Sequence, residues 1–245
     1  MSNFNIIKLD AITSTNDWLK KKYHENECSD GDLIWANEQT MGRGQKNNAW
    51  LSEPGKNLTF SFFKIFKSLK VNDQFMINCS VSTAIISALK KIQIPNLSLK
   101  WPNDILSDHK KICGVLVENY IKGDSILGSI IGVGLNINQT DFSAIKGASS
   151  LLNQTNNRFD LEFVLNLLLT SFEESFKFCN SENKENLIRE YEKSLFAKNQ
   201  LSKFVINNES FSATIKGIDL DGKLVLENEK KEIIRFSSST IKMIY

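Results

Sequence analysis

Residues 98–138 read SLKWPNDILSDHKKICGVLVENYIKGDSILGSIIGVGLNIN and form the centre of the expected fold. Apolar patterns over 98–101, 111–120 and 125–138 predict three strands. The short polar connection Lys122-Gly123-Asp124 is typical of a hairpin between the last two strands. We therefore expect a mostly antiparallel sheet in the middle of the molecule.

Both flanks of this region add helices and strands. Upstream, strands are expected at 4–9, 32–37 and 57–66. A helix that follows the polar cap Ser14-Thr15-Asn16 is expected to end near His24, and a buried helix covers 73–92. Helical periodicity returns over 159–178 and 184–196. The pattern predicts an α+β fold, with a mixed, mostly antiparallel central sheet and flanking helices.

A change of pattern near Asn199 predicts a domain boundary. Short strands and a tight Asp221-Gly222 turn follow it. The remaining segment of about 46 residues is too short to bury much core of its own. We expect a main domain over residues 1–198 and a small C-terminal β-barrel over residues 199–245.

The composition is that of a globular protein without a strong overall charge. Of the 245 residues 41% are hydrophobic, and 30 Lys and Arg against 28 Asp and Glu give a formal charge of +2. This balance provides no general attraction to DNA or to an acidic membrane. Apolar runs fall short of the roughly 20 residues that span a bilayer, and residues 1–10 do not resemble a secretory signal. We expect a cytoplasmic protein that binds neither DNA nor membranes.

The four cysteines indicate neither a zinc site nor a disulfide framework. They are widely spaced without a C-x-x-C pair, and the chain has two histidines. We expect buried, reduced thiols at Cys28, Cys79, Cys113 and Cys179.

Charged side chains gather around the segment Lys-Trp-Pro-Asn-Asp at 100–104, written KWPND below. Pro102 favours an extended residue before it, which fixes the direction of Lys100 and Asn103. Lys111 follows at the start of the next predicted strand. Two cations, an amide and a carboxylate in this arrangement suit a small anionic ligand. Asp104 could be a metal ligand, an acceptor for an ammonium group, or the ion-pair partner of Lys100.

Two glycine-containing segments extend this interpretation. Gly42-Arg43-Gly44 lies in a polar loop over 39–50, where backbone N–H groups and a guanidinium could bind phosphate or carboxylate, although an ordinary exposed loop would look the same. Gly132-Val133-Gly134 offers a second backbone approach, and Gly114 indicates either such an approach or a packing requirement.

No P-loop, dinucleotide fingerprint or nucleophilic triad is visible. The residues suit a reaction that aligns two anions, such as adenylation of a carboxylate by ATP.

The order of these segments resembles that of the biotin protein ligases. The matching residues are Ser14-Thr15-Asn16, Gly42-Arg43-Gly44, KWPND, Lys111-x-x-Gly114 and Gly132-x-Gly134-x-Asn136. The resemblance implies that biotin and MgATP form biotinyl-5′-AMP, and that the biotinyl group passes to one lysine of a biotin carrier protein, such as the acetyl-CoA carboxylase carrier subunit. It also implies a monofunctional enzyme without an N-terminal DNA-binding domain, as a monomer or homodimer.

The resemblance further assigns roles to individual residues. Biotin would be bound by Ser14, Thr15, Gln39, Gly42, Arg43, Lys111 and Gly114. ATP or the adenylate would be bound by Arg43, Trp50, Asn103, Lys111 and Asn136. The catalytic residues would be Lys111, Arg43 and Asp104. Whether Asp104 accepts the proton of the incoming lysine or only positions other groups stays open, and metal ligands are not assigned.

The glycine-rich loop departs from the family pattern GRGRxGRxW. Gln45 and Asn48 stand where that pattern has arginine, and Asn47 stands where it has glycine. The lost positive charge predicts weaker retention of the adenylate without loss of its synthesis, and Lys46 partly compensates.

Two other functions stay open at this point. A lipoate or octanoate protein ligase or transferase would have a similar fold, but its motifs do not match KWPND. A non-catalytic biotin-binding module would have no need for Lys111 and Arg43.

Overall fold

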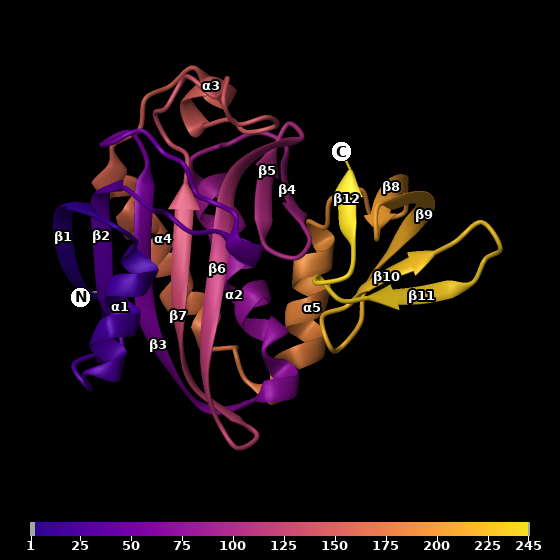
Figure 1. Cartoon of the computed structure of the whole chain (residues 1–245), viewed down its shortest axis with the longest axis horizontal. Coiled ribbons are helices and arrows are strands. Elements are labelled where there is room, and N and C mark those ends of the chain that lie inside the picture. The colour runs from indigo at the N-terminus through magenta and orange to yellow at the C-terminus, as the bar shows by residue number, and fades with distance from the viewer. Residues whose placement is uncertain (1–2, 245) are drawn as a thin grey trace.

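The computed structural model describes residues 3–244, except for the side chain of Asn47. Its larger part is a seven-stranded sheet flanked by helices on both faces, and a smaller sheet follows at the C-terminal end (Figure 1). None of the helices within residues 3–244 has the length and apolar character needed to cross a membrane.

The central sheet is mixed and mostly antiparallel, as predicted. Its strands, in spatial order, are β1 (Asn5–Ile12), β2 (Asp32–Gln39), β3 (Leu58–Lys70), β7 (Ser125–Leu135), β6 (Lys110–Lys122), β5 (Asp104–Ser107) and β4 (Leu97–Lys100). β1 and β2 are parallel, whereas each of the other neighbouring pairs is antiparallel. The long β3, β7 and β6 strands lie next to one another in the middle of this order.

Helices cover the two faces unequally. On one face lies α1 (Thr15–His24), whose Leu19 packs on Ile34, Phe63 and Ile130 of the sheet. Its first turn is capped by Ser14, since Asp17 N donates to Ser14 Oγ at 3.4 Å. The other face carries the larger core beneath α2 (Phe75–Lys91), α4 (Leu161–Phe176) and α5 (Lys184–Lys193) (Figure 1).

Several short elements were not predicted from the sequence. They are α3 (Leu151–Thr155), strand β5 and the 3-10 turns at Gln45–Asn47, Val71–Asp73 and Ser181–Asn183. Each spans three to five residues, which is too short for hydrophobic periodicity to identify. The most important is β5, because it makes KWPND the turn of a hairpin in which Lys100 pairs with Asp104.

The C-terminal segment forms the small all-β unit that the sequence predicted. Its strands β8 (Leu201–Ile206), β9 (Glu209–Ile218), β10 (Leu224–Glu227), β11 (Ile233–Phe236) and β12 (Lys242–Ile244) form one antiparallel sheet in the order β11-β10-β9-β8-β12. We retain 1–198 and 199–245 as proposed domain limits, since α5 ends at Lys193 and β8 begins at Leu201.

Polar contacts fasten the C-terminal sheet to the rest of the chain. Trp101 Nε1 donates to Gly222 O at 2.9 Å, which joins KWPND to the turn before β10. Glu192 on α5 accepts a hydrogen bond from Ile218 N at 2.6 Å. The second sheet is thereby held next to the charged hairpin.

Candidate active site

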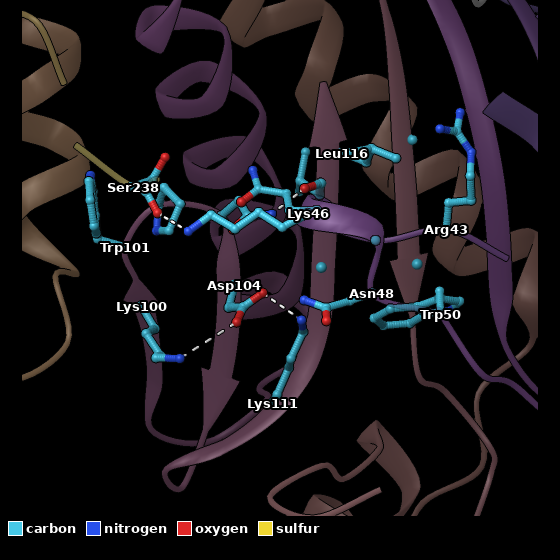
Figure 2. A pocket seen from close by; sticks show the side chains of 18 of the residues that line it. Arg43, Lys46, Asn48, Trp50, Lys100, Trp101, Asp104, Lys111, Leu116 and Ser238 are labelled. Carbon is cyan, nitrogen blue, oxygen red and sulfur yellow. Dashed lines mark hydrogen bonds and ion pairs between the residues drawn. The ribbon is translucent and has the colours of Figure 1, made fainter. Parts of the chain in front are cut away.

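One cavity brings together most of the residues that the sequence singled out. It has a volume of about 300 Å³ and is lined by parts of both sheets (Figure 2). The predicted residues that line it are Ser14, Thr15, Gln39, Arg43, Trp50, Asn103, Asp104, Lys111 and Gly114, whereas Gly42 and Asn136 are outside the lining. The C-terminal sheet adds an apolar wall that the sequence did not predict, made by Phe204, Ile215, Leu224 and Met243.

Lys100, Asp104 and Lys111 form a charged cluster in this cavity (Figure 2). Lys111 Nζ lies 2.6 Å from Asp104 Oδ1, and Lys100 Nζ lies 3.9 Å from Asp104 Oδ2. The β4–β5 hairpin and the neighbouring strand β6 place these three side chains together. Lys100 and Lys111 thus share the carboxylate of Asp104, and both ammonium groups line the cavity, which suits an anionic ligand.

Burial lowers the pKa of Lys100 below the usual lysine value. Its side chain is 15% exposed, and desolvation disfavours the charged ammonium group. Attraction to Asp104 opposes this effect, while the charges of Lys111 and Lys242 reinforce it. An anion bound beside Lys100 would favour its charged form, as Asp104 does.

Hydrogen bonds fix the KWPND turn against neighbouring elements. Asn103 Nδ2 donates to Val115 O at 2.5 Å, and Val115 N donates to Asn103 O at 3.1 Å. Tyr191 OH donates to Pro102 O at 3.2 Å, and the Trp101–Pro102 peptide bond is cis. Asn103 thus lines the cavity while its amide nitrogen is engaged with β6, a structural role that the sequence did not indicate.

A second polar group lies at the N-terminal end of α1. Gln39 Oε1 accepts hydrogen bonds from Thr15 N at 2.8 Å and from Thr15 Oγ1 at 3.0 Å. Thr15 Oγ1 also lies 2.7 Å from Ser61 Oγ, which donates to Asn16 Oδ1 at 2.5 Å. We call Thr15, Gln39, Ser61 and Asn16 the uncharged network. It presents oriented hydroxyl and amide groups to the cavity without a charge of its own.

Arg43 lies apart from the lysine cluster (Figure 2). Its guanidinium NH2 group lies 2.6 Å from Asp17 Oδ1 and 3.0 Å from Glu118 Oε2. The resemblance had implied that Arg43 binds biotin and the adenylate, whereas this structure pairs it with two carboxylates at the rim. Neither Asp17 nor Glu118 was singled out from the sequence, because nothing local links positions 17, 43 and 118.

The glycine-rich loop is closed by its own backbone. Trp50 N donates to Gly42 O at 2.8 Å, and Gly44 N donates to Asn48 O at 2.6 Å. A Cβ at Gly42 would lie 2.5 Å from Trp50 O, which explains glycine there. The expected approach of the Gly44 N–H to a ligand is therefore not what this structure shows. Lys46 points away from the lysine cluster, and its ammonium donates to Ser238 O near the C-terminal sheet (Figure 2).

Gly132 and Gly134 on β7 line the cavity and leave room for neighbouring side chains. A Cβ at Gly132 would lie 2.1 Å from Asn16 Oδ1, and one at Gly134 would lie 2.3 Å from Trp50 Cε2. Gly114, opposite Gly134 in the sheet, would place a Cβ 3.1 Å from Trp50 Cζ3. Gly114 also lines the cavity, so both explanations that the sequence left open for it, packing and close approach to a ligand, stay open.

Trp50 and Asn136 each bury a polar atom without a hydrogen-bond partner in the described part of the chain. These atoms are Trp50 Nε1 and Asn136 Oδ1. Asn136 Nδ2 donates to Ser149 O at 2.9 Å, which fixes the amide so that its oxygen is the unused atom. Lys111 Nζ lies 5.6 Å from the centroid of the Trp50 ring. The unused acceptor Asn136 Oδ1 is of the kind that pairs with an amino group of a ligand.

The cavity offers few ligands to a metal ion. Among the described residues no three His, Cys, Asp or Glu side chains come together. Asp104 is the one carboxylate in the described lining, and it is shared with two lysines. A hard cation would therefore take most of its oxygen ligands from a substrate and from water.

Comparisons with known proteins identify related chains. Residues 9–136 match the model of the Biotin/lipoate A/B protein ligase family. The bifunctional ligase/repressor BirA of Bacillus subtilis is 27% identical over 233 residues, which cover 92% of this chain and 70% of BirA. The biotin–[acetyl-CoA-carboxylase] ligase of Mycobacterium tuberculosis is 27% identical over 151 residues, covering 59% of this chain and 55% of that protein. The biotin protein ligase of Aquifex aeolicus, solved with biotin and ATP, superposes with a TM-score of 0.81 at 27% identity and covers 98% of both chains.

Proposed function

The chain belongs to the Biotin/lipoate A/B protein ligase family, and we propose that it is a biotin protein ligase that activates biotin with ATP. The main observation in support of this proposal is that a single cavity joins the uncharged network to the cluster of Lys100, Asp104 and Lys111. A ligand with a polar, uncharged head and a carboxylate at its other end matches these two environments.

The uncharged network is the proposed site for the ureido head of biotin. A ureido group has one carbonyl acceptor and two N–H donors, and Thr15 and Gln39 carry both kinds of partner. Ser14 lines the cavity beside them, while its hydroxyl caps α1. The dithiolane ring of lipoate has no N–H or C=O group, so it would form no such hydrogen bonds with Thr15 and Gln39. This argument favours biotin over lipoate or octanoate.

The lysine cluster is the proposed site of adenylation. A carboxylate oxygen of biotin attacks the α-phosphorus of ATP, and pyrophosphate leaves. Both reactants are anions, so Lys111 would reduce their repulsion and stabilise the charge that develops on the α-phosphate. Lys100 would add charge at the same end, and Asp104 would hold both ammonium groups in place.

The nucleotide would lie toward Trp50 and Asn136. The Trp50 ring would supply an apolar surface for adenine. Asn136 Oδ1 has no partner but is buried and outside the cavity lining, so it must become accessible if it is to accept from the amino group of adenine. Mg²⁺, when bound, would neutralise triphosphate charge, with Asp104 as its nearest protein carboxylate in the cavity. Arg43 must exchange Asp17 and Glu118 for the adenylate if it is to act on that intermediate.

The second half-reaction is proposed to modify a biotin carrier protein, such as the carrier subunit of acetyl-CoA carboxylase. The lysine amine of the carrier attacks the acyl carbon of biotinyl-5′-AMP, AMP leaves, and the amine loses a proton. Asp104 is the proposed acceptor of that proton or the group that positions the amine. The cytoplasmic location, the lack of a DNA-binding role and the monomeric or homodimeric state stay predictions.

Pyrophosphate exchange into ATP tests this function directly. The purified protein would be assayed with biotin, with lipoate and without an acid. We expect exchange that requires biotin and falls by about 10²-fold or more in Lys111→Ala, because that ammonium group stabilises the transition-state charge. Lys110→Ala, next to it on β6 and exposed, is the matched control.

The other outcomes identify the alternatives. Exchange with lipoate alone would assign the chain to the lipoate branch of the family. Tight biotin binding without any exchange would indicate a binding module instead of an enzyme.

A further inference from the structure

We propose that Glu118 is a positioning residue that holds Arg43 at the cavity rim as a competing anion and, through Asn16, links this arginine to the uncharged network. The inference rests on the proposed function, since it concerns how the adenylate is retained. Glu118 is not in the cavity lining and acts through other residues.

Glu118 contacts both systems with one carboxylate. Its Oε2 accepts from Asn16 Nδ2 at 2.8 Å and lies 3.0 Å from the NH2 group of Arg43. Its Oε1 lies 3.3 Å from the same guanidinium nitrogen. Asn16 in turn accepts from Ser61, which contacts Thr15. A continuous series of hydrogen bonds therefore connects the proposed ureido site with Arg43.

The position of Glu118 is fixed by the central sheet. It lies on β6 opposite Ile130, two residues beyond the pair formed by Leu116 and Gly132. Gly132 leaves the space that Asn16 occupies, so the sheet also determines where Asn16 meets Glu118. Arg43, by contrast, belongs to a loop outside the sheet. In any rearrangement the arginine is the partner that moves, and Glu118 is the fixed point.

The charge balance gives this contact its effect. Arg43 is compensated by Asp17 and Glu118, so the adenylate phosphate must compete with both carboxylates for the guanidinium. The Asp17 side chain is 46% exposed and that of Glu118 is 28% exposed, so solvent screens the Glu118 pair less. Removing the charge of Glu118 should free Arg43 and strengthen its hold on the adenylate.

The test measures release of biotinyl-5′-AMP from the purified enzyme together with the KM for biotin. Glu118→Gln keeps an acceptor for Asn16 but loses the charge. We expect release of the adenylate to slow roughly fivefold, which corresponds to the contribution of one partly screened ion pair, and the KM for biotin to stay unchanged. Glu118→Ala also removes the acceptor and should raise the KM for biotin. In an Arg43→Ala background, Glu118→Gln should no longer alter release.

Asp17→Asn is the matched control, because it contacts Arg43 but not the Asn16 side chain. It should slow release without raising the KM for biotin, whereas Glu118→Asp should keep release near the wild-type rate. Release from Glu118→Gln that is unchanged or faster, or a change that persists without Arg43, would overturn the proposal. Failure of the wild-type enzyme to make any adenylate would instead overturn the proposed function.

Discussion

The uncharged network and the lysine cluster, the two polar regions of the cavity, differ in the partners that the chain gives to their polar groups. In the uncharged network, Thr15, Gln39, Ser61 and Asn16 are hydrogen-bonded to one another. In the lysine cluster, two ammonium groups share the carboxylate of Asp104, and burial lowers the pKa of Lys100. The first region consists of uncharged groups bonded to one another, whereas in the second one carboxylate contacts two ammonium groups.

This difference indicates how one cavity can treat the two parts of a substrate separately. Oriented neutral groups select a ligand by geometry, since a wrong head group leaves buried polar atoms unpaired. Excess charge selects by electrostatics and acts most strongly where negative charge develops. Changes in the first region should alter biotin affinity, and changes in the second should alter chemistry and ATP affinity.

The largest expected effect is that of Asp104→Asn. Loss of the shared carboxylate would leave Lys100 and Lys111 without the group that orients them, and misplacement by about 1 Å can reduce a rate by about 10²-fold. Single-turnover experiments would measure adenylate formation and transfer to the carrier separately. A variant with both rates intact would exclude proton acceptance by Asp104 and any need for its positioning.

The two glycines of β7 offer a paired test of the comparison. Gly132→Ala places a methyl group against Asn16, and Gly134→Ala places one against Trp50. We expect the first to raise the KM for biotin and the second to raise the KM for ATP, each by about tenfold, since overpacking costs about 1–3 kcal/mol. Steady-state kinetics with each substrate varied in turn would check this. Equal effects of both variants on both KM values would show that the two regions are not separable.

A smaller effect is expected in the pH dependence of ATP binding. Because the pKa of Lys100 is lowered, its charge is present at low pH and disappears, as pH rises, before that of an ordinary lysine. The KM for ATP should therefore increase with pH below the normal lysine range. Lys100→Arg, whose guanidinium stays charged, should move this increase to higher pH. Identical profiles for the two proteins would show that Lys100 does not contribute charge to ATP binding.

The smallest expected effect concerns the altered glycine-rich loop. Gln45 stands where the family pattern has arginine, so we expect synthesis of the adenylate with weak retention. Gln45→Arg should slow adenylate release by about threefold, in keeping with one exposed charge. Rapid-quench measurement of bound adenylate would test it. Slow release by the wild-type chain would contradict the prediction of weak retention.

Much of the fold was predictable because its signals are local. The strands β6 and β7 and their hairpin follow from alternation and from the turn at Gly123. The cap of α1 follows from Ser14. Strand β5 was missed because four residues carry too little periodicity, and with it the hairpin that pairs Lys100 with Asp104 was missed as well.

The sequence predicted which residues belong to the candidate site better than it predicted the contacts that these residues make. The motifs identified the cations that line the cavity, since Arg43, Lys100 and Lys111 stand in distinctive segments. They did not reveal the partners of Arg43, because Glu118 lies 75 residues further along the chain. They also suggested that Gly132 approaches a ligand, whereas a neighbouring side chain fills its space.

The sequence by itself determined the order of most elements, the gathering of charged side chains in KWPND and the chemical types of the side chains around a proposed adenylation site. These properties depend on residues close together in the chain, where backbone preferences and hydrophobic alternation act. Tertiary structure alone decided that Asp104 is shared by Lys100 and Lys111, that Arg43 is held by Asp17 and Glu118, and that the C-terminal sheet closes the cavity. The physical reason is that alternation fixes which face of a strand a side chain occupies, whereas strand register and packing fix which distant charge it meets.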